Sequence, residues 1–154
     1  MAIAIYAGSF DPPTEFQAGV FPASVIAADL NGDDNLDLVA ANVGGGDISI
    51  LLGDGTGSFR PPVHFGVGYD PLSVVAVDLN EDGNIDLATT NSSGDDVSVL
   101  LGNGAGSFGE LAHYSAGHTP STVIAADLNE DGHLDLVTAN PSGSDVSVLL
   151  GNGE

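Results

Sequence analysis

The sequence predicts an all-β fold in which one unit of four short strands occurs three times, and three observations predict it. The acidic pattern D-L-N-x-D-x-x-x-D-L begins at Asp29, Asp78 and Asp127, with a constant step of 49 residues. Short runs rich in Val, Ile, Leu and Thr alternate with turn residues. No helical period of 3.6 residues continues across these turns. Internal repetition is therefore the organising feature of the chain.

Each repeat is expected to contain four antiparallel strands. In the middle copy these are the ranges Leu72 to Val77, Ile85 to Thr90, Val97 to Leu101 and Phe108 to Ser115. Four strands in about 40 to 50 residues are typical of a β-propeller blade, which buries both faces only against neighbouring blades. A stacked solenoid would also be repetitive, but the strand count and the acidic loop at a hairpin tip favour the propeller. Three blades do not close a ring, so the ring is expected to be incomplete in one chain.

The predicted organisation is a single repeat domain over residues 1–154. Residues 1–19 form a partial unit with strands three and four (Ala2 to Tyr6 and Phe10 to Ala18), followed by repeats at 20–68, 69–117 and 118–154, the last lacking its fourth strand. We expect the Phe10 to Ala18 strand of one subunit to complete the last repeat of another by strand addition. Such a homo-oligomer is either a closed six-bladed dimer or a head-to-tail filament.

The acidic loops have the donors of a calcium site. Side-chain oxygens at loop positions 1, 3, 5 and 9, together with the carbonyl at position 7, can surround a hard cation, and about three Ca²⁺ ions per chain are expected. Acidic turns without a metal are the alternative, because Asp, Asn and Gly are common turn formers. Three copies with four donors each favour the metal. The candidate ligands are Asp29, Asn31, Asp33, Asn35, Asp37, Asp78, Asn80, Asp82, Asn84, Asp86, Asp127, Asn129, Asp131, His133 and Asp135.

The loops differ in detail. An EF-hand would need an acidic residue at position 12, where the chain has Ala or Thr. Gly83 and Gly132 suit the positive φ that position 6 of the loop requires, whereas the first copy has Asp34 there. We therefore predict weaker binding at the first site. Glu81 and Glu130, at position 4, are expected to face solvent.

Charge and composition exclude several functions. The net charge of −21 disfavours binding to nucleic acid or to anionic membranes and favours a cationic partner. Regular apolar runs predict a packed fold over a disordered one. The chain has no Cys, no run long enough to insert into a membrane, and no signal-peptide pattern in its opening residues. Calcium is most available outside the cell, so an extracellular or cell-surface location is expected.

Catalysis has no dedicated residues in the sequence. Most paired carboxylates belong to the acidic loops, and no phosphate-binding Gly loop with Lys occurs. His64 and His113 are one repeat apart and are expected on the outer edges of neighbouring units rather than in a zinc site. Asn91 begins a formal N-glycosylation sequon in an expected turn. We therefore predict a protein that is not an enzyme.

The chain resembles the FG-GAP/VCBS repeats of integrin-type propellers and many secreted bacterial proteins. The resemblance rests on D-L-N-x-D-x-x-x-D-L in each copy and on V-S-V-L-L-G-N-G-x-G-S-F at Val97 to Phe108. It implies blades that hold calcium between strands one and two, through the ligand positions given above. Asp34 is the clearest departure from the pattern. The function expected is a calcium-binding scaffold for extracellular adhesion or recognition of a protein or glycan. A lectin-like module and an accessory domain of an exported enzyme are the alternatives.

Overall fold

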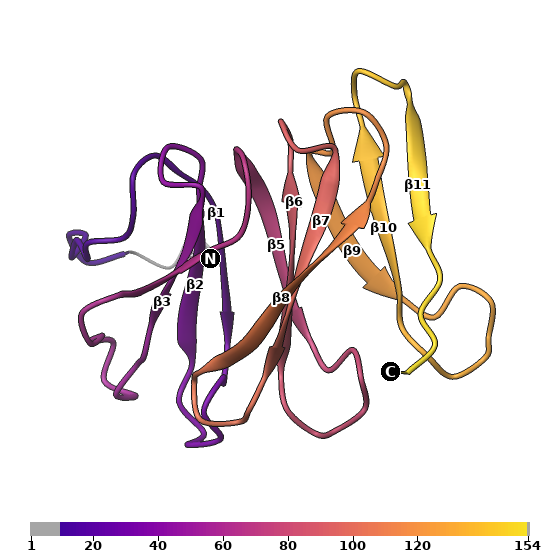
Figure 1. Ribbon diagram of the computed structural model, residues 1–154. Helices are drawn as coiled ribbons and strands as arrows, with labels where there is room; N and C mark the ends of the chain where they lie inside the picture. The colour runs from indigo at the N-terminus through magenta and orange to yellow at the C-terminus, as the bar shows by residue number, and fades with distance from the viewer. Residues whose placement is uncertain (1–9, 154) are drawn as a thin grey trace, which may run out of the picture.

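The structure, a computed structural model, describes residues 10–153, and these residues form three antiparallel sheets without a helix (Figure 1). The sheets are numbered in chain order, and the strands of each are given in the order in which they pair. Sheet 1 contains β1 (Pro22–Ala28), β2 (Asp37–Asn42), β3 (Asp47–Leu51) and β4 (Val63–Gly66). Sheet 2 contains β5 (Pro71–Val77), β6 (Asp86–Asn91), β7 (Asp96–Gly102) and β8 (Phe108–Ser115). Sheet 3 contains β9 (Thr122–Ala126), β10 (Asp135–Asn140) and β11 (Asp145–Leu149).

The predicted strands of the middle copy are confirmed within about two residues at each end, a normal difference between assignments. The acidic loops connect the first strand of each sheet to the second, as expected for hairpin tips. The strand expected at Phe10 to Ala18 is wrong for the single chain, because residues 10–18 are in no sheet. The strand expected at Ala2 to Tyr6 lies outside the described residues. Within residues 10–153, no helix is long and apolar enough to cross a membrane.

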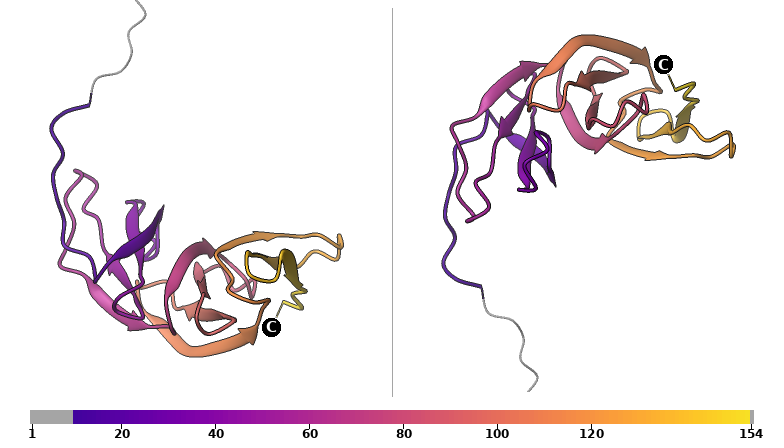
Figure 2. Two further views of the ribbon diagram at one scale, coloured as in Figure 1. Left: turned by 90° about the horizontal axis from the view of Figure 1, so that it is seen from above. Right: turned by 90° about the horizontal axis from the view of Figure 1, so that it is seen from below.

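The three sheets lie side by side in a curved row, with residues 10–18 at one end and β11 at the other (Figure 2). The first strands of consecutive sheets, β1, β5 and β9, are neighbours. One apolar cluster, which includes Ile48, Val74 and Leu87, lies between sheets 1 and 2. A second, which includes Val97 and Leu136, lies between sheets 2 and 3. The core therefore lies between sheets, and each sheet is covered only where it has a neighbour.

The central sheet shows how one strand contributes to both clusters. Side chains alternate across a strand with a period of two. In β7, Val97 and Val99 face the cluster shared with sheet 3, and Leu100 faces the cluster shared with sheet 1. All three are buried, and all six residues of β6 are buried as well. Sheet 2 therefore has two apolar faces, one packed on sheet 1 and the other on sheet 3.

Each second strand ends in a buried asparagine that holds the following turn. Asn91 donates from Nδ2 to Oδ1 of Asp96 at 2.5 Å and to Oγ of Ser98 at 2.7 Å, and its side chain is fully buried. Asn42 and Asn140 make the equivalent contacts. Asn91 is the last residue of β6 rather than part of a turn. Its amide is enclosed in the folded chain, so glycosylation of this sequon would require unfolding.

Candidate metal-binding loops

The three acidic loops lie along the same edge of the row of sheets (Figure 1). In the middle loop, the backbone NH of Asp82 is 3.2 Å from Oδ1 of Asp78 and 3.1 Å from Oδ1 of Asn80. Asp82 accepts hydrogen bonds from Nδ2 of Asn80 at 3.2 Å and from the NH of Asn84 at 2.8 Å. The same contacts, at 2.7–3.2 Å, form around Asp33 and Asp131. The structure therefore brings the predicted ligands at positions 1, 3 and 5 together around one turn.

Backbone NH groups lower the pKa of one carboxylate in each loop. The NH of Asn84 lowers the pKa of Asp82, and the NH of His133 lowers the pKa of Asp131 in the same way. At Asp29, desolvation acts to raise the pKa, but four backbone NH groups of the loop outweigh it, and the pKa lies below its ordinary value. Hydrogen bonds to the charged form have this effect. These three carboxylates therefore favour the charged form, which is the form that binds a hard cation.

The carboxylate at position 9 has a different environment, because Asp37, Asp86 and Asp135 are fully buried. Oδ2 of Asp86 accepts the NH of Leu79 at 2.8 Å, and Oδ1 accepts the NH of Gly102 at 2.7 Å. The other two loops have the same pair of bonds at 2.8–3.0 Å. This buried Asp therefore joins the start of its loop to the end of the third strand. Its predicted role as a metal ligand stays a prediction.

The glycine at the end of the third strand is a structural partner of the loop that sequence reasoning missed. A Cβ atom on Gly102 would overlap the carbonyl oxygen of Ile85, at loop position 8. Gly53 and Gly151 are equally close to their loops. Only glycine lets the backbone approach closely enough for its NH to reach the buried Asp. The repeated L-G-[DN]-G sequence was the signal, but it shows no partner because the two bonded residues are 16 positions apart.

The positive φ expected at loop position 6 is confirmed, but it does not set the first loop apart from the other two. Asp34 does have a positive φ of 65°, and Gly83 and Gly132 at the same loop position have φ of 87° and 97°. Position 4 is left-handed too, with Gly32 at 71° in the first loop and Glu81 at 61° in the second. Each loop thus has one glycine and one other residue in this region, and backbone strain does not distinguish the first site. Weaker binding at that site stays an untested prediction.

Glu81 does not simply face solvent. Its Oε1 is 2.6 Å from Nδ1 of His133 in the third loop, and both side chains are partly exposed. The Glu81 carboxylate raises the pKa of His133. Glu130, the equivalent residue of the third loop, is exposed. Neighbouring acidic loops are therefore in direct contact between sheets 2 and 3.

The oxygen donors fit a hard divalent cation in chemistry, since carboxylate, amide and carbonyl oxygens are what calcium binds. Within residues 10–153, however, no group of three or more His, Cys, Asp or Glu side chains is arranged closely enough to hold a metal ion. The buried bonds of the position-9 carboxylates are consistent with this result. The carboxylates at positions 1 and 5 of each loop, with the amide oxygen at position 3, are the donors that share one turn.

A serine, a histidine and an aspartate meet on the outer half of sheet 2. Ser98 Oγ is 3.1 Å from Nδ1 of His113, and Asp96 Oδ1 is 3.5 Å from the same nitrogen. Sheet 1 repeats this arrangement around His64. A proton relay needs the serine and the aspartate on opposite ring nitrogens. These contacts instead fasten β8 and β4, the outer strands on which both histidines were expected, to the strands beside them.

Comparisons with known proteins identify the repeats. A family model described as an FG-GAP-like repeat matches residues 29–89 and again residues 78–138, so that both matches start at the first residue of an acidic loop. Together they cover more than half of the chain. No curated protein matches it.

A similar fold occurs in a solved structure of the Photorhabdus luminescens Tc holotoxin pore with a mutation in TccC3. The TM-score is 0.53 and the sequence identity is 19%. The match covers 85% of this chain but 6% of that one. At this identity the likeness shows the fold alone.

Proposed function

Because the chain belongs to the family of FG-GAP-like repeats, we propose that it is a calcium-binding β-propeller module that acts as a scaffold for extracellular adhesion or recognition. The observation that carries the proposal is the clustering of anionic and amide oxygens at three equivalent hairpin tips on one edge. Carboxylates crowded at each tip repel one another, and a bound divalent ion would offset that repulsion. Binding to the folded state alone would then stabilise the module.

In the middle loop, Asp78, Asn80 and Asp82 would supply side-chain oxygens and Asn84 its carbonyl, with Asp86 as a further ligand. The pattern is the same in the other two loops. The buried position-9 Asp accepts one NH at each oxygen. A carboxylate oxygen has a second lone pair, so this residue could link the ion to the end of the third strand.

Calorimetric titration and thermal unfolding test the proposal together. We expect about three calcium ions per chain and a melting temperature that rises with calcium and falls with a chelator. Each filled site adds about 2.7 kcal/mol when free calcium is 100 times its Kd. An unchanged melting temperature, with no heat of binding, would refute calcium as the ligand. The same titration shows whether one of the three sites binds more weakly than the other two.

Two adjacent acidic residues of the third loop provide a matched control. Asp131→Asn alters a predicted ligand, and Glu130→Gln removes the same charge from an exposed residue one position earlier. Asp131→Asn should lower the calcium stoichiometry by one site, and Glu130→Gln should leave it unchanged. Equal effects of both variants would mean that general electrostatic attraction, rather than coordination, draws calcium to the loop.

The remaining parts of the proposal follow from this role. The module acts without catalysis, in an extracellular or cell-surface setting where weak calcium sites fill. Its copies assemble into a six-bladed dimer or a head-to-tail filament. The match covers only 6% of the toxin-pore chain, which shows a similar fold within a much longer chain. The lectin-like and enzyme-accessory alternatives stay predictions.

A further inference from the structure

The two outward faces of the row of sheets are apolar and exposed. On sheet 3, Val146 and Val148 are 66% and 50% exposed. Their repeat equivalents in sheet 2, Val97 and Val99, are at most 8% exposed because sheet 3 covers them. On the opposite end, Val25 of sheet 1 is 62% exposed. Exposed apolar faces of this kind mark interaction sites.

These two faces are complementary to each other. The exposed face of sheet 3 carries the repeat equivalents of the residues through which sheets 1 and 2 contact the next sheet, such as Ile48 and Val97. The face of sheet 1 has the residues that sheets 2 and 3 use to contact the sheet before, such as Val74 and Val123, which are both 4% exposed. The chain already makes this interface twice. A second copy of the chain, with its sheet 1 on sheet 3 of the first, would make it again.

Aromatic contacts show where the segment of residues 10–18 belongs. Phe65 of β4 contacts Phe108 of the next sheet edge to face, with ring centroids 5.5 Å apart at 81°. Phe16 contacts Phe59 in the same way, at 5.1 Å and 80°. Phe16 therefore contacts sheet 1 in the same way that Phe65, a residue of the fourth strand of sheet 1, contacts sheet 2. The segment has the position of a fourth strand of a preceding sheet, although residues 10–18 are in no sheet themselves.

The sequence of the segment agrees with this position. Phe10-Asp-Pro-Pro-Thr-Glu-Phe16 aligns with Phe59-Arg-Pro-Pro-Val-His-Phe65, which leads into β4. Both prolines lie before the paired part of the strand, where a missing NH costs no ladder bond. The Phe10 side chain is 99% exposed. Its repeat equivalents, Phe59 and Phe108, are partly buried, so Phe10 lacks the apolar contacts that the other two rings make.

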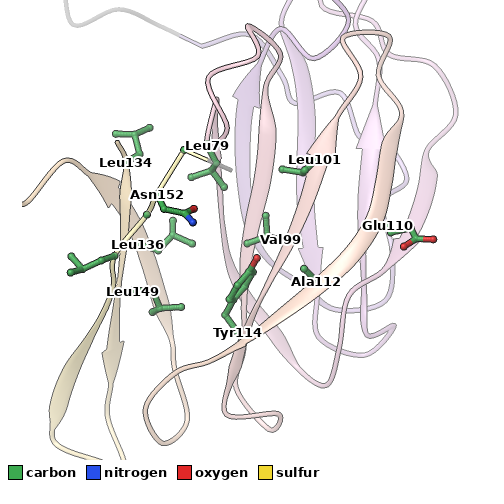
Figure 3. Close-up of a pocket in the computed structure, with 13 residues that line it drawn as sticks. Leu79, Val99, Leu101, Glu110, Ala112, Tyr114, Leu134, Leu136, Leu149 and Asn152 are labelled. Atoms are coloured by element: carbon green, nitrogen blue, oxygen red, sulfur yellow. The ribbon is translucent and has the colours of Figure 1, made fainter. Parts of the chain in front are cut away.

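A groove between sheets 2 and 3 lies where the repeat would place a phenylalanine ring equivalent to Phe108. In sheet 2 the Phe108 ring lies beside Gly102 and against Phe65. The corresponding residues one repeat later, Gly151 and Tyr114, line an open groove of about 180 Å³ whose other walls are mostly leucine (Figure 3). The repeat places a phenylalanine ring in this groove.

We propose that residues 10–18 of a second copy pair with β11 and that its Phe10 fills the groove between Tyr114 and Gly151. The segment and β11 lie at opposite ends of the row, so residues 10–18 of the same molecule do not reach β11 and the proposed segment is that of a second copy (Figure 2). The pairs Ile48 with Phe65 and Val97 with Tyr114 set the register. By repeat they place Phe16 opposite Val146, and Glu15 opposite Ser147. This inference rests on the assembly part of the proposed function and names its contacts.

At one position the segment has an acidic side chain where the other two fourth strands have histidine. Glu15 stands where His64 and His113 approach Asp47 and Asp96 at 3.6 and 3.5 Å. In the proposed contact Glu15 would meet Asp145, and two carboxylates repel each other. The net charge of −21 also opposes self-association, so added salt should strengthen the assembly. Glu15→His is expected to strengthen it further.

Sedimentation of the whole 154-residue chain in calcium buffer tests the groove. We expect the wild type to associate reversibly into a dimer or a longer oligomer. Phe10→Ala should raise the dissociation constant about tenfold or more, as for a buried aromatic anchor. Tyr69→Ala, which removes an exposed ring that does not line the groove, should leave the constant unchanged. Glu15→His should lower it, and this gain does not depend on a variant that could misfold.

A designed disulfide tests the register, since the chain has no other cysteine. Glu15→Cys combined with Ser147→Cys should give disulfide-linked dimers under oxidising conditions, and Glu15→Cys combined with Ser142→Cys should not. An oligomer that lacks this crosslink and is unaffected by Phe10→Ala would overturn the inference while self-assembly stands. A chain that is folded and monomeric at all concentrations would overturn both. Neither result bears on calcium binding, which the titration judges separately.

Discussion

Sheets 2 and 3 contain the same nine residues, D-V-S-V-L-L-G-N-G, in two different environments. They occupy 96–104 in sheet 2 and 145–153 in sheet 3. Both copies form the third strand of their sheet with the same register to the second strand. In sheet 2 the valines are buried, and in sheet 3 they are exposed. The nine residues thus determine the strand, and the elements that lie against it determine its burial.

The polar contacts of the two copies, in contrast, are nearly identical. Asp86 and Asp135 each accept two backbone NH groups, and Asn91 and Asn140 each hold the aspartate and the serine of the strand that follows. The donor and the acceptor of each of these hydrogen bonds belong to the same repeat. They therefore form whether or not a neighbouring sheet is present, whereas apolar burial needs the neighbour.

The largest expected effect is from the buried aspartate. Asp86→Ala should destabilise the fold by about 2–5 kcal/mol, because it leaves two enclosed NH groups without an acceptor. Asp135→Ala should cost a similar amount, since its bonds are the same. Urea unfolding at pH 7 measures both. If Asp135→Ala proved neutral, the polar bonds of sheet 3 would depend on a neighbouring sheet, as its apolar contacts do.

Matched valine substitutions sharpen the comparison at intermediate effect. Val97→Ala should cost about 1–3 kcal/mol, because it opens space in a packed core. Val146→Ala should change the stability of the monomer by less than about 0.5 kcal/mol, as for an exposed site. Unfolding at low protein concentration gives both values. Under conditions in which the chain is assembled, the cost of Val146→Ala should rise toward that of Val97→Ala.

The smallest effect is expected where the turn between β6 and β7 contacts the segment that connects β8 to β9. Asp95 accepts the NH of Thr119 and a bond from His118, both at 2.8 Å, and these contacts lower its pKa. A lowered folded-state pKa stabilises the protein above the ordinary carboxyl pKa, and the effect is lost as pH falls through the folded value. Asp95→Asn should therefore reduce the loss of melting temperature on acidification below about pH 4. Sheet 1 has Gly46 at this position and should show no such contribution.

Sequence reasoning located most of the fold and part of the site. The strands and acidic hairpins were predictable because each depends on neighbours within a few residues. The convergence of loop positions 1, 3 and 5 was predictable for the same reason. Gly102 as partner of Asp86, and His133 as partner of Glu81, were not, because those contacts join distant parts of the chain. The left-handed residue at position 4 of each loop was not anticipated, and weaker binding at the first site stays a prediction.

By itself the sequence determined the repeat, the order of strands within each sheet and the oxygen donors at each hairpin tip, since these follow from side-chain period and turn chemistry within one unit. Only the tertiary structure decided which of the repeated valines are covered, which aspartate of each loop is enclosed, and which phenylalanine side chains have partners. The physical reason is that apolar burial and long-range hydrogen bonds depend on what lies opposite a residue. Identical residues in successive repeats have different neighbours opposite them.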